Sequence, residues 1–297
     1  MTSESLQPRP CLGPIEGTTP PARPLPAGTW DTHFHVFGPL DRFPYAVKRK
    51  YTPPEAPFDA YIALAQRLGI SRAVCVHPNV HGPDNAVTLD ALRRANGRFA
   101  GIIKASEHLS LGDLREMDAA GVRGVRFAFN PEHGGELDEN VFDRFASWTG
   151  ELRWCIDFHM APERLDVLAP RLAKLTVPVV IDHFARIDPA KGIEQRPFRV
   201  LLELVGHGNV WVKLSGADRV SRTGPPYADV VPFARALVAA APTRMLWGTD
   251  WPHSGYFDQA RMPDDAALAD LVFDFAPNEA DRMRLLVDNP KALFERE

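Results

Sequence analysis

Eight short apolar segments, rich in β-branched and aromatic residues, recur along the chain and leave room for a helix between each and the next. Intervening stretches such as 58–68 and 86–95 have apolar side chains at the i, i+3, i+4 spacing of an amphipathic helix. This alternation predicts repeated βα units and a parallel sheet. The expected strands are 29–37, 72–77, 99–104, 124–129, 154–159, 177–183, 210–215 and 245–249.

Eight parallel strands are the number that closes into a (β/α)8 TIM barrel, so the expected fold class is α/β of that type. The 297 residues suffice for one barrel of about 250 residues with an extension. Residues 1–28 are dense in proline, glycine and threonine and lack periodicity, which indicates an extended N-terminal arm before a barrel at 29–297. An open doubly wound sheet is the weaker alternative, because a histidine pair occupies the place of its glycine-rich nucleotide loop.

Charge and composition narrow the range of partners. A net charge of −4, with no lysine-rich tract, gives no attraction for nucleic acid, and no apolar run approaches the roughly 20 residues of a bilayer span. Three widely separated cysteines and an N-terminus without a basic start or an apolar stretch favour a reducing, cytoplasmic location. The expected partner is therefore a small molecule, and a homo-oligomer is left open.

Potential metal ligands stand at the ends of expected strands. His33 and His35 are two residues apart on the first strand, so their imidazoles should point into the barrel. Asp250 follows the last apolar segment and His183 ends the sixth. The alternative reading of the pair is two hydrogen-bonded core histidines, but four convergent ligand-type side chains favour a cation. Asp182 and Asp188, in contrast, are expected to be no more than turn residues or helix caps.

The arrangement of these residues resembles the amidohydrolase superfamily, and more narrowly its lactone-hydrolase branch, which includes 2-pyrone-4,6-dicarboxylate hydrolases and sulfomuconolactone hydrolases. The resemblance spans nearly the whole chain. It rests on the stretches WDTHFHVFGP, HPNVHGPDN, VIDHFAR, GTDWPH and DNPKALF. It implies that one group of residues holds a metal or activates water, namely His33, His35, His183 and Asp250. It implies that a second group contacts an anionic substrate, namely Tyr51, Arg126, Arg219 and His253.

The implied activity is metal-dependent hydrolysis of an anionic lactone from aromatic degradation. A divalent cation lowers the pKa of bound water towards about 7 and polarises an ester carbonyl, and Asp250 is then the natural general base, with His183 beside it. One ion, zinc or manganese, is expected, because no residue matches a carbamylated bridging lysine. Two reactions on the same barrel remain alternatives, decarboxylation of an aromatic acid and isomerisation of a sugar lactone.

Several assignments stay open. His159 ends the fifth segment and competes with His183 as the third nitrogen ligand, with His183 preferred and His159 otherwise lining the substrate pocket. Arg126 could bind an anion or form a salt bridge with a carboxylate, and Arg219 could bind substrate or be merely solvated.

The loops give further expectations. His77 is a pocket candidate, whereas His81 and Asn85 are expected to organise a βα loop. Glu132 and His133 stand where the dicarboxylate hydrolases carry another basic residue, which favours a muconolactone bearing a sulfo group. The long loops at 39–57 and 217–226 are expected to hold substrate.

Overall fold

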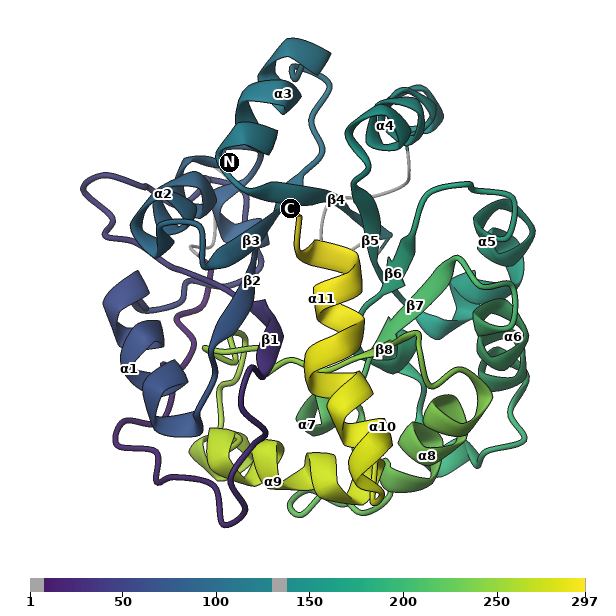
Figure 1. Cartoon of the computed structure of the whole chain (residues 1–297). Coiled ribbons are helices and arrows are strands. Elements are labelled where there is room, and N and C mark those ends of the chain that lie inside the picture. The colour runs from purple at the N-terminus through teal and green to yellow at the C-terminus, as the bar shows by residue number, and fades with distance from the viewer. Residues whose placement is uncertain (1–7, 130–137, 297) are drawn as a thin grey trace, which may run out of the picture.

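The computed structural model describes residues 8–129 and 138–296, and within them eight parallel strands form a single sheet in the order β1 to β8. Figure 1 shows the strands at the centre with helices around them. The prediction of a (β/α)8 barrel is confirmed. The strands are β1 (Trp30–Phe34), β2 (Arg72–Val76), β3 (Phe99–Lys104), β4 (Val122–Phe129), β5 (Cys155–Met160), β6 (Val179–Ile181), β7 (Val210–Lys213) and β8 (Met245–Leu246).

The barrel closes where β1 meets the chain that follows β8. Thr32 N–H donates to the Trp247 carbonyl at 2.9 Å, and the N–H of Asp250 donates to the carbonyl of His33 at 2.8 Å. His35 N–H donates to the carbonyl of Trp251 at 2.8 Å. These backbone bonds bring the predicted ligands of the first strand alongside the residue that follows the last.

Helices cover the outside of the sheet, and the two that were predicted in detail, α1 (Phe58–Leu68) and α2 (Ala86–Ala95), have the predicted bounds. Gly69, at φ 79°, ends α1 in the left-handed conformation that glycine adopts without steric cost. The other helices are α3 (Leu111–Ala119), α4 (Glu139–Leu152), α5 (Leu165–Leu172), α6 (Arg196–Val205), α7 (Ala217–Val220), α8 (Val231–Ala240), α9 (Asp265–Phe275), α10 (Glu279–Met283) and α11 (Asn289–Phe294).

Side chains alternate between two apolar cores, as the two-residue period of a strand requires. In β2, Ala73 and Cys75 belong to the larger cluster of strand and helix residues, whereas Val74 and Val76 belong to a smaller one. Phe294 of α11 joins the smaller cluster and stacks on Trp30, with ring centroids 6.4 Å apart. The C-terminal helix therefore covers the end of the barrel where β1 begins, and the opposite end is left for a site.

Five expected strands, β1, β2, β6, β7 and β8, are shorter than predicted, and one expected loop contains a helix. β1 ends at Phe34 and β6 at Ile181, so His35 and His183 lie just beyond their strands. After β6 the chain leaves the sheet in a left-handed turn, which ends the strand's hydrogen-bonding pattern. The 217–226 segment opens with the short helix α7, whereas 39–57 contains no helix.

The described part of the N-terminal segment, residues 8–28, runs along the barrel without a helix or an extended strand. The backbone N–H groups of Ala22 and Arg23 donate to the carboxylate of Asp270 in α9 at 2.8 and 2.9 Å. The division into an arm and a barrel at residue 28 stays a prediction. None of the helices in the described residues combines the length and the apolar composition that a bilayer span requires.

Candidate active site

Three imidazoles converge on one carboxylate oxygen at the end of the barrel opposite α11. The Nε2 atoms of His33, His35 and His183 lie 3.6, 3.4 and 3.8 Å from Oδ1 of Asp250. All four residues are buried, with at most 7% of any of them exposed. The structure thus brings together the four residues that the sequence proposed as a ligand set, from the ends of β1, β6 and β8.

The second ring nitrogen of each histidine has its own contact. Nδ1 of His35 lies 2.7 Å from the Val76 carbonyl, and because a carbonyl only accepts, this nitrogen carries the proton and Nε2 presents a lone pair. Nδ1 of His183 lies 2.9 Å from Oγ of Ser215, and Nδ1 of His33 lies 3.2 Å from Oδ1 of Asp182. Such outer contacts orient the rings of metal-binding histidines.

The donor set fits a divalent cation. Nε2 of His33 is fully buried and has no hydrogen-bond partner among the described residues, which is costly for a polar atom unless something else binds it. His33, His35 and Asp250 offer ligand atoms that all lie within 4.8 Å of one another, and His33, Asp182 and His183 form a second such group. Both groups contain His33, and neither contains His159, the rival that the sequence left open.

A left-handed turn places His183. Four consecutive residues without glycine, His183 to Arg186, have φ between 51° and 59°. Each residue in this conformation costs about 1–2 kcal/mol, so the surrounding structure must hold the turn. Phe184 does so by packing against Phe275 of α9, with ring centroids 5.8 Å apart. The turn brings the side chains of both His183 and Arg186 to the wall of the cavity.

A buried network of two carboxylates and two cations lies next to His33. Nζ of Lys213 lies 2.5 Å from Asp157 and 3.0 Å from Asp182, and Nη2 of Arg126 lies 2.6 Å from Asp182. The expectation that Asp182 merely caps a turn is wrong, because its side chain makes no capping hydrogen bond and joins this network. Asp188 does cap a turn, accepting from the N–H of Ala190.

Burial and neighbouring charges set the protonation of the site. Burial alone would raise the pKa of Asp250, but the Arg219 guanidinium and the histidines hold it well below its usual range. Burial lowers the pKa of His183 to about 4. The pKa of His33 is likewise lowered well below its usual value by burial, against the opposing effect of Asp182. At neutral pH the Asp250 carboxylate is therefore ionised, and the imidazoles of His33 and His183 are neutral.

A cavity of about 210 Å³ opens beside Asp250. Four of its lining residues are cationic, Lys50, Arg126, Arg186 and Arg219, whereas Asp250 is its one acidic residue among those described. The remaining lining residues are His35, Tyr51, Pro78, Asn79, His159, His183, Ser254, Gly255 and Phe257. The balance of charge in this cavity favours an anionic ligand.

Tyr51, Arg126, His159 and Arg219, which the sequence proposed for substrate binding, all line this cavity. The hydroxyl of Tyr51 shares a 2.6 Å hydrogen bond with Oγ of Ser254. Arg126 also forms a salt bridge with Asp182, which is the alternative role that the sequence left open for this residue. Arg219 is not merely solvated, because its Nε contacts Oδ2 of Asp250.

The structure does not bring His77 and His253 to the cavity lining. His77 is engaged at both ring nitrogens, with Thr88 at 3.1 Å and the Gly82 carbonyl at 3.0 Å. His253 is fully buried, and its Nε2 lies 2.9 Å from Oδ1 of Asp265. The prediction that these two histidines contact substrate has no support in this geometry.

Two loop expectations can also be compared with the structure. Asn85 organises its loop as expected, accepting from the Lys104 N–H at 2.8 Å, and Nδ1 of His81 lies 3.2 Å from the carbonyl of Pro44. Glu132 and His133 lie outside the described residues.

Sequence reasoning missed Arg186 and the Lys213–Asp157 pair. Arg186 stands in the quoted stretch VIDHFAR, and the reasoning applied to Arg126, a cation at the end of an apolar segment, could have found it. Lys213 ends the apolar strand VWVK, where a fully buried lysine requires a carboxylate partner.

Comparison with known proteins agrees with this geometry. A family model described as Amidohydrolase matches residues 30–296. The chain is 55% identical to a 4-sulfomuconolactone hydrolase of Hydrogenophaga intermedia, over 99% of this chain and 98% of that protein. It is 38% identical to a 2-pyrone-4,6-dicarboxylate hydrolase of Comamonas testosteroni, over 92% and 93%. An apo crystal structure of an Agrobacterium tumefaciens protein, 32% identical, superposes with a TM-score of 0.83 over 93% of this chain and 99% of that one.

Proposed function

The chain belongs to the amidohydrolase family, and from this premise we propose that it hydrolyses a lactone that carries anionic substituents. The observation that carries the proposal is the position of Asp250, whose Oδ1 lies 3.4–3.8 Å from three imidazole nitrogens beside a cationic cavity. The named relatives at 55% and 38% identity are both hydrolases of such compounds. A carboxylate base and an anion-binding wall are the two parts that this reaction needs.

The cationic wall supplies the recognition. Arg126, Arg186 and Arg219 each present a guanidinium, which binds a carboxylate or a sulfonate through two parallel hydrogen bonds. Burial lowers the pKa of Arg186, and the nearby Arg219 lowers it further, so an anion between these two side chains would relieve their repulsion. The ring carbonyl of a bound lactone would then face Asp250.

We propose that one divalent cation, zinc or manganese, is held by His33, His35, His183 and Asp250, whose nitrogen and oxygen donors suit either metal. Such an ion, when bound, lowers the pKa of water and polarises an ester carbonyl. Two observations support this assignment. Nε2 of His33 has no hydrogen-bond partner among the described residues, and Nδ1 of His35 is engaged by a carbonyl, which leaves its Nε2 for a metal.

The residues of the chain account for the movement of protons. Asp250, ionised at neutral pH, accepts a proton from the water that attacks the lactone carbonyl. The new bond joins the water oxygen to the carbonyl carbon, and the ring C–O bond breaks. Asp250 then returns the proton to the leaving oxygen, which yields the ring-opened hydroxy or keto acid. His183, neutral and oriented by Ser215, lies beside this carboxylate throughout.

A sulfonated muconolactone is the proposed substrate. The higher identity to the sulfomuconolactone hydrolase supports it. So does the sequence around Glu132 and His133, which lacks the second basic residue expected in dicarboxylate hydrolases. We also propose a cytoplasmic location, which the free thiols of Cys11, Cys75 and Cys155 support.

The test is a panel of lactones given to the purified, metal-supplemented chain, with ring opening followed by proton release and by product mass. We expect turnover of 4-sulfomuconolactone in preference to 2-pyrone-4,6-dicarboxylate. Hydrolysis adds the mass of one water, whereas isomerisation leaves the mass unchanged and decarboxylation removes carbon dioxide. A product of either of the latter kinds would replace the proposed reaction by one of its alternatives.

Two pairs of variants make the assay specific. Asp250→Asn should lower kcat by about 100- to 10,000-fold, the usual contribution of general base catalysis, whereas the matched change Asp113→Asn in the cap of α3 should leave kcat unchanged. His33→Ala should lower the metal content as well as kcat. The control is His108→Ala, at an exposed histidine whose side chain is 82% accessible.

A further inference from the structure

Residues 8–12 of the N-terminal arm are bonded to the loop that follows β1. The N–H of Cys11 donates to the carbonyl of Thr52, and the N–H of Thr52 donates to the carbonyl of Arg9, both at 2.9 Å. The hydroxyl of Thr52 donates to the carbonyl of Pro8 at 3.0 Å. These three bonds hold the arm against the residue next to Tyr51.

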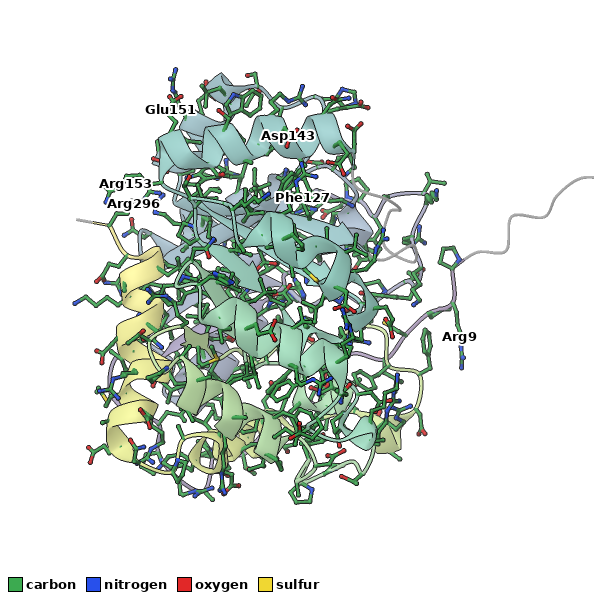
Figure 2. The ribbon with its side chains drawn as sticks, turned by 90° about the vertical axis from the view of Figure 1, so that its right-hand side faces the viewer. Arg9, Phe127, Asp143, Glu151, Arg153 and Arg296 are labelled. Carbon is green, nitrogen blue, oxygen red and sulfur yellow. The ribbon has the colours of Figure 1, made fainter. Side chains whose placement is uncertain are left out.

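The same five residues are bonded on their other side to the loop that follows β8. The N–H of Leu12 donates to the carbonyl of Tyr256 at 2.8 Å, and the N–H of Gly255 donates to Sγ of Cys11 at 3.4 Å. The guanidinium carbon of Arg9 lies 4.5 Å from the ring centroid of Phe257. Figure 2 shows Arg9 on the side of the molecule opposite α11 and Arg296, which is the end that contains the cavity.

Both loops contribute to the wall of the cavity. Tyr51 comes from the first, and Ser254, Gly255 and Phe257 come from the second. The backbone of both loops is irregular at these residues, so their positions depend on tertiary contacts, and ordering such residues costs conformational entropy. The hydrogen bond between Tyr51 and Ser254 joins the loops directly, and the arm joins them a second time through the backbone.

We propose that residues 8–12 are positioning residues, which hold the Tyr51 loop and the 254–257 loop in the arrangement that binds substrate. The substrate in this inference is the one in the proposed function, on which this part of the inference rests. The contacts between the arm and the two loops do not depend on that function. The arm makes its bonds mainly to backbone atoms, and its side chains are absent from the cavity lining among the residues described. Loss of these bonds should therefore weaken substrate binding more than it slows the chemical step at Asp250.

The experiment replaces backbone donors of the arm in the full chain. Cys11→Pro and Leu12→Pro each remove an N–H group that bonds to a loop carbonyl. We expect each to raise KM by about 2- to 10-fold, the factor represented by one lost hydrogen bond, with kcat within about 3-fold of the parent chain. In hydrogen–deuterium exchange, peptides containing Tyr51 and Gly255 should exchange faster, while the β3 peptide should be unchanged.

Glu16→Pro is the matched control within the arm. Gly17, at φ 73°, is the third residue of a turn, and a type II turn places Glu16 where proline is favoured. This variant should behave as the parent chain in both measurements.

Three outcomes would overturn the inference. These are an unchanged KM together with unchanged loop exchange, an equal effect of Glu16→Pro, and a loss of activity that follows the loss of folded protein. Should the parent chain turn over no lactone, the exchange measurement would still decide the role of the arm, independently of the proposed function.

Discussion

Arg219 and Asp250 form an ion pair in which the guanidinium Nε contacts Oδ2, while the other carboxylate oxygen faces the three imidazoles. The pair is largely excluded from water, with 17% of the arginine and 2% of the aspartate side chain exposed. Because Arg219 also lines the cavity, its guanidinium would contact an anionic substrate as well as Asp250. Recognition and catalysis are thereby linked through one guanidinium.

Arg219→Met should raise KM for the anionic lactone by about 10- to 100-fold, since hydrogen bonds to charged groups contribute about 1.5–3 kcal/mol. It should also raise the pKa of Asp250 and move the acid limb of the activity profile to higher pH. Initial rates against substrate concentration and pH measure both effects. Arg222→Met removes an exposed arginine nearby, whose side chain is 61% accessible, and should leave KM unchanged.

Lys213→Met should destabilise the fold by about 3–5 kcal/mol, the cost of leaving buried charges without their partner. Lys213, Asp157 and Asp182 are all fully buried, and without Lys213 the remaining cation that contacts both carboxylates, among the residues described, would be Arg126. Chemical denaturation measures the loss. Adding Asp157→Asn should recover part of it, and a double variant no more stable than the single one would contradict this account.

Ala185→Gly should lower the unfolding free energy by about 1–2 kcal/mol less than Ala91→Gly does. Glycine relieves the strain of the left-handed conformation at residue 185, whereas residue 91 lies in a right-handed helix, where glycine relieves no strain. Both alanines are buried, with 0% and 1% exposed, so the loss of the methyl group is similar in the two variants. Unfolding free energies of the two single variants provide the comparison. Equal costs would mean that the turn is not strained.

Activity should persist as the pH falls from 8 to 5 and then decline near pH 4. The pKa of His183 is lowered to about 4 by burial and that of Asp250 lies below its usual range, so both groups remain deprotonated through this window. The pH profile of kcat/KM measures this directly. An acid limb near pH 6.5, the ordinary value for histidine, would contradict the assignment.

The lowered pKa of His183 also makes the stability of the fold depend on pH. In the unfolded chain, His183 binds a proton at its ordinary pKa. In the folded chain, His183 does not bind a proton until the pH falls to about 4. Acidification through this range therefore favours unfolding, and the unfolding free energy should fall as the pH is lowered from about 6.5 towards 4.

The amino-acid sequence by itself determined the architecture and the chemistry-bearing pattern of this protein. Apolar periodicity is a local property, so it predicted the eight βα units and the bounds of α1 and α2. His33, His35 and Asp250 could be found because they lie at the ends of strands, and parallel strands of a barrel present those ends at one face.

Only the tertiary structure decided which side chains meet. The buried network of Lys213, Asp157 and Asp182 joins strands that are far apart in the sequence. No local sequence pattern predicts that these side chains meet in the barrel interior. The left-handed turn after β6 arises from packing rather than propensity, because alanine and phenylalanine disfavour it. The contacts of residues 8–12 with two distant loops likewise depend on barrel closure, the long-range event that brings β8 beside β1.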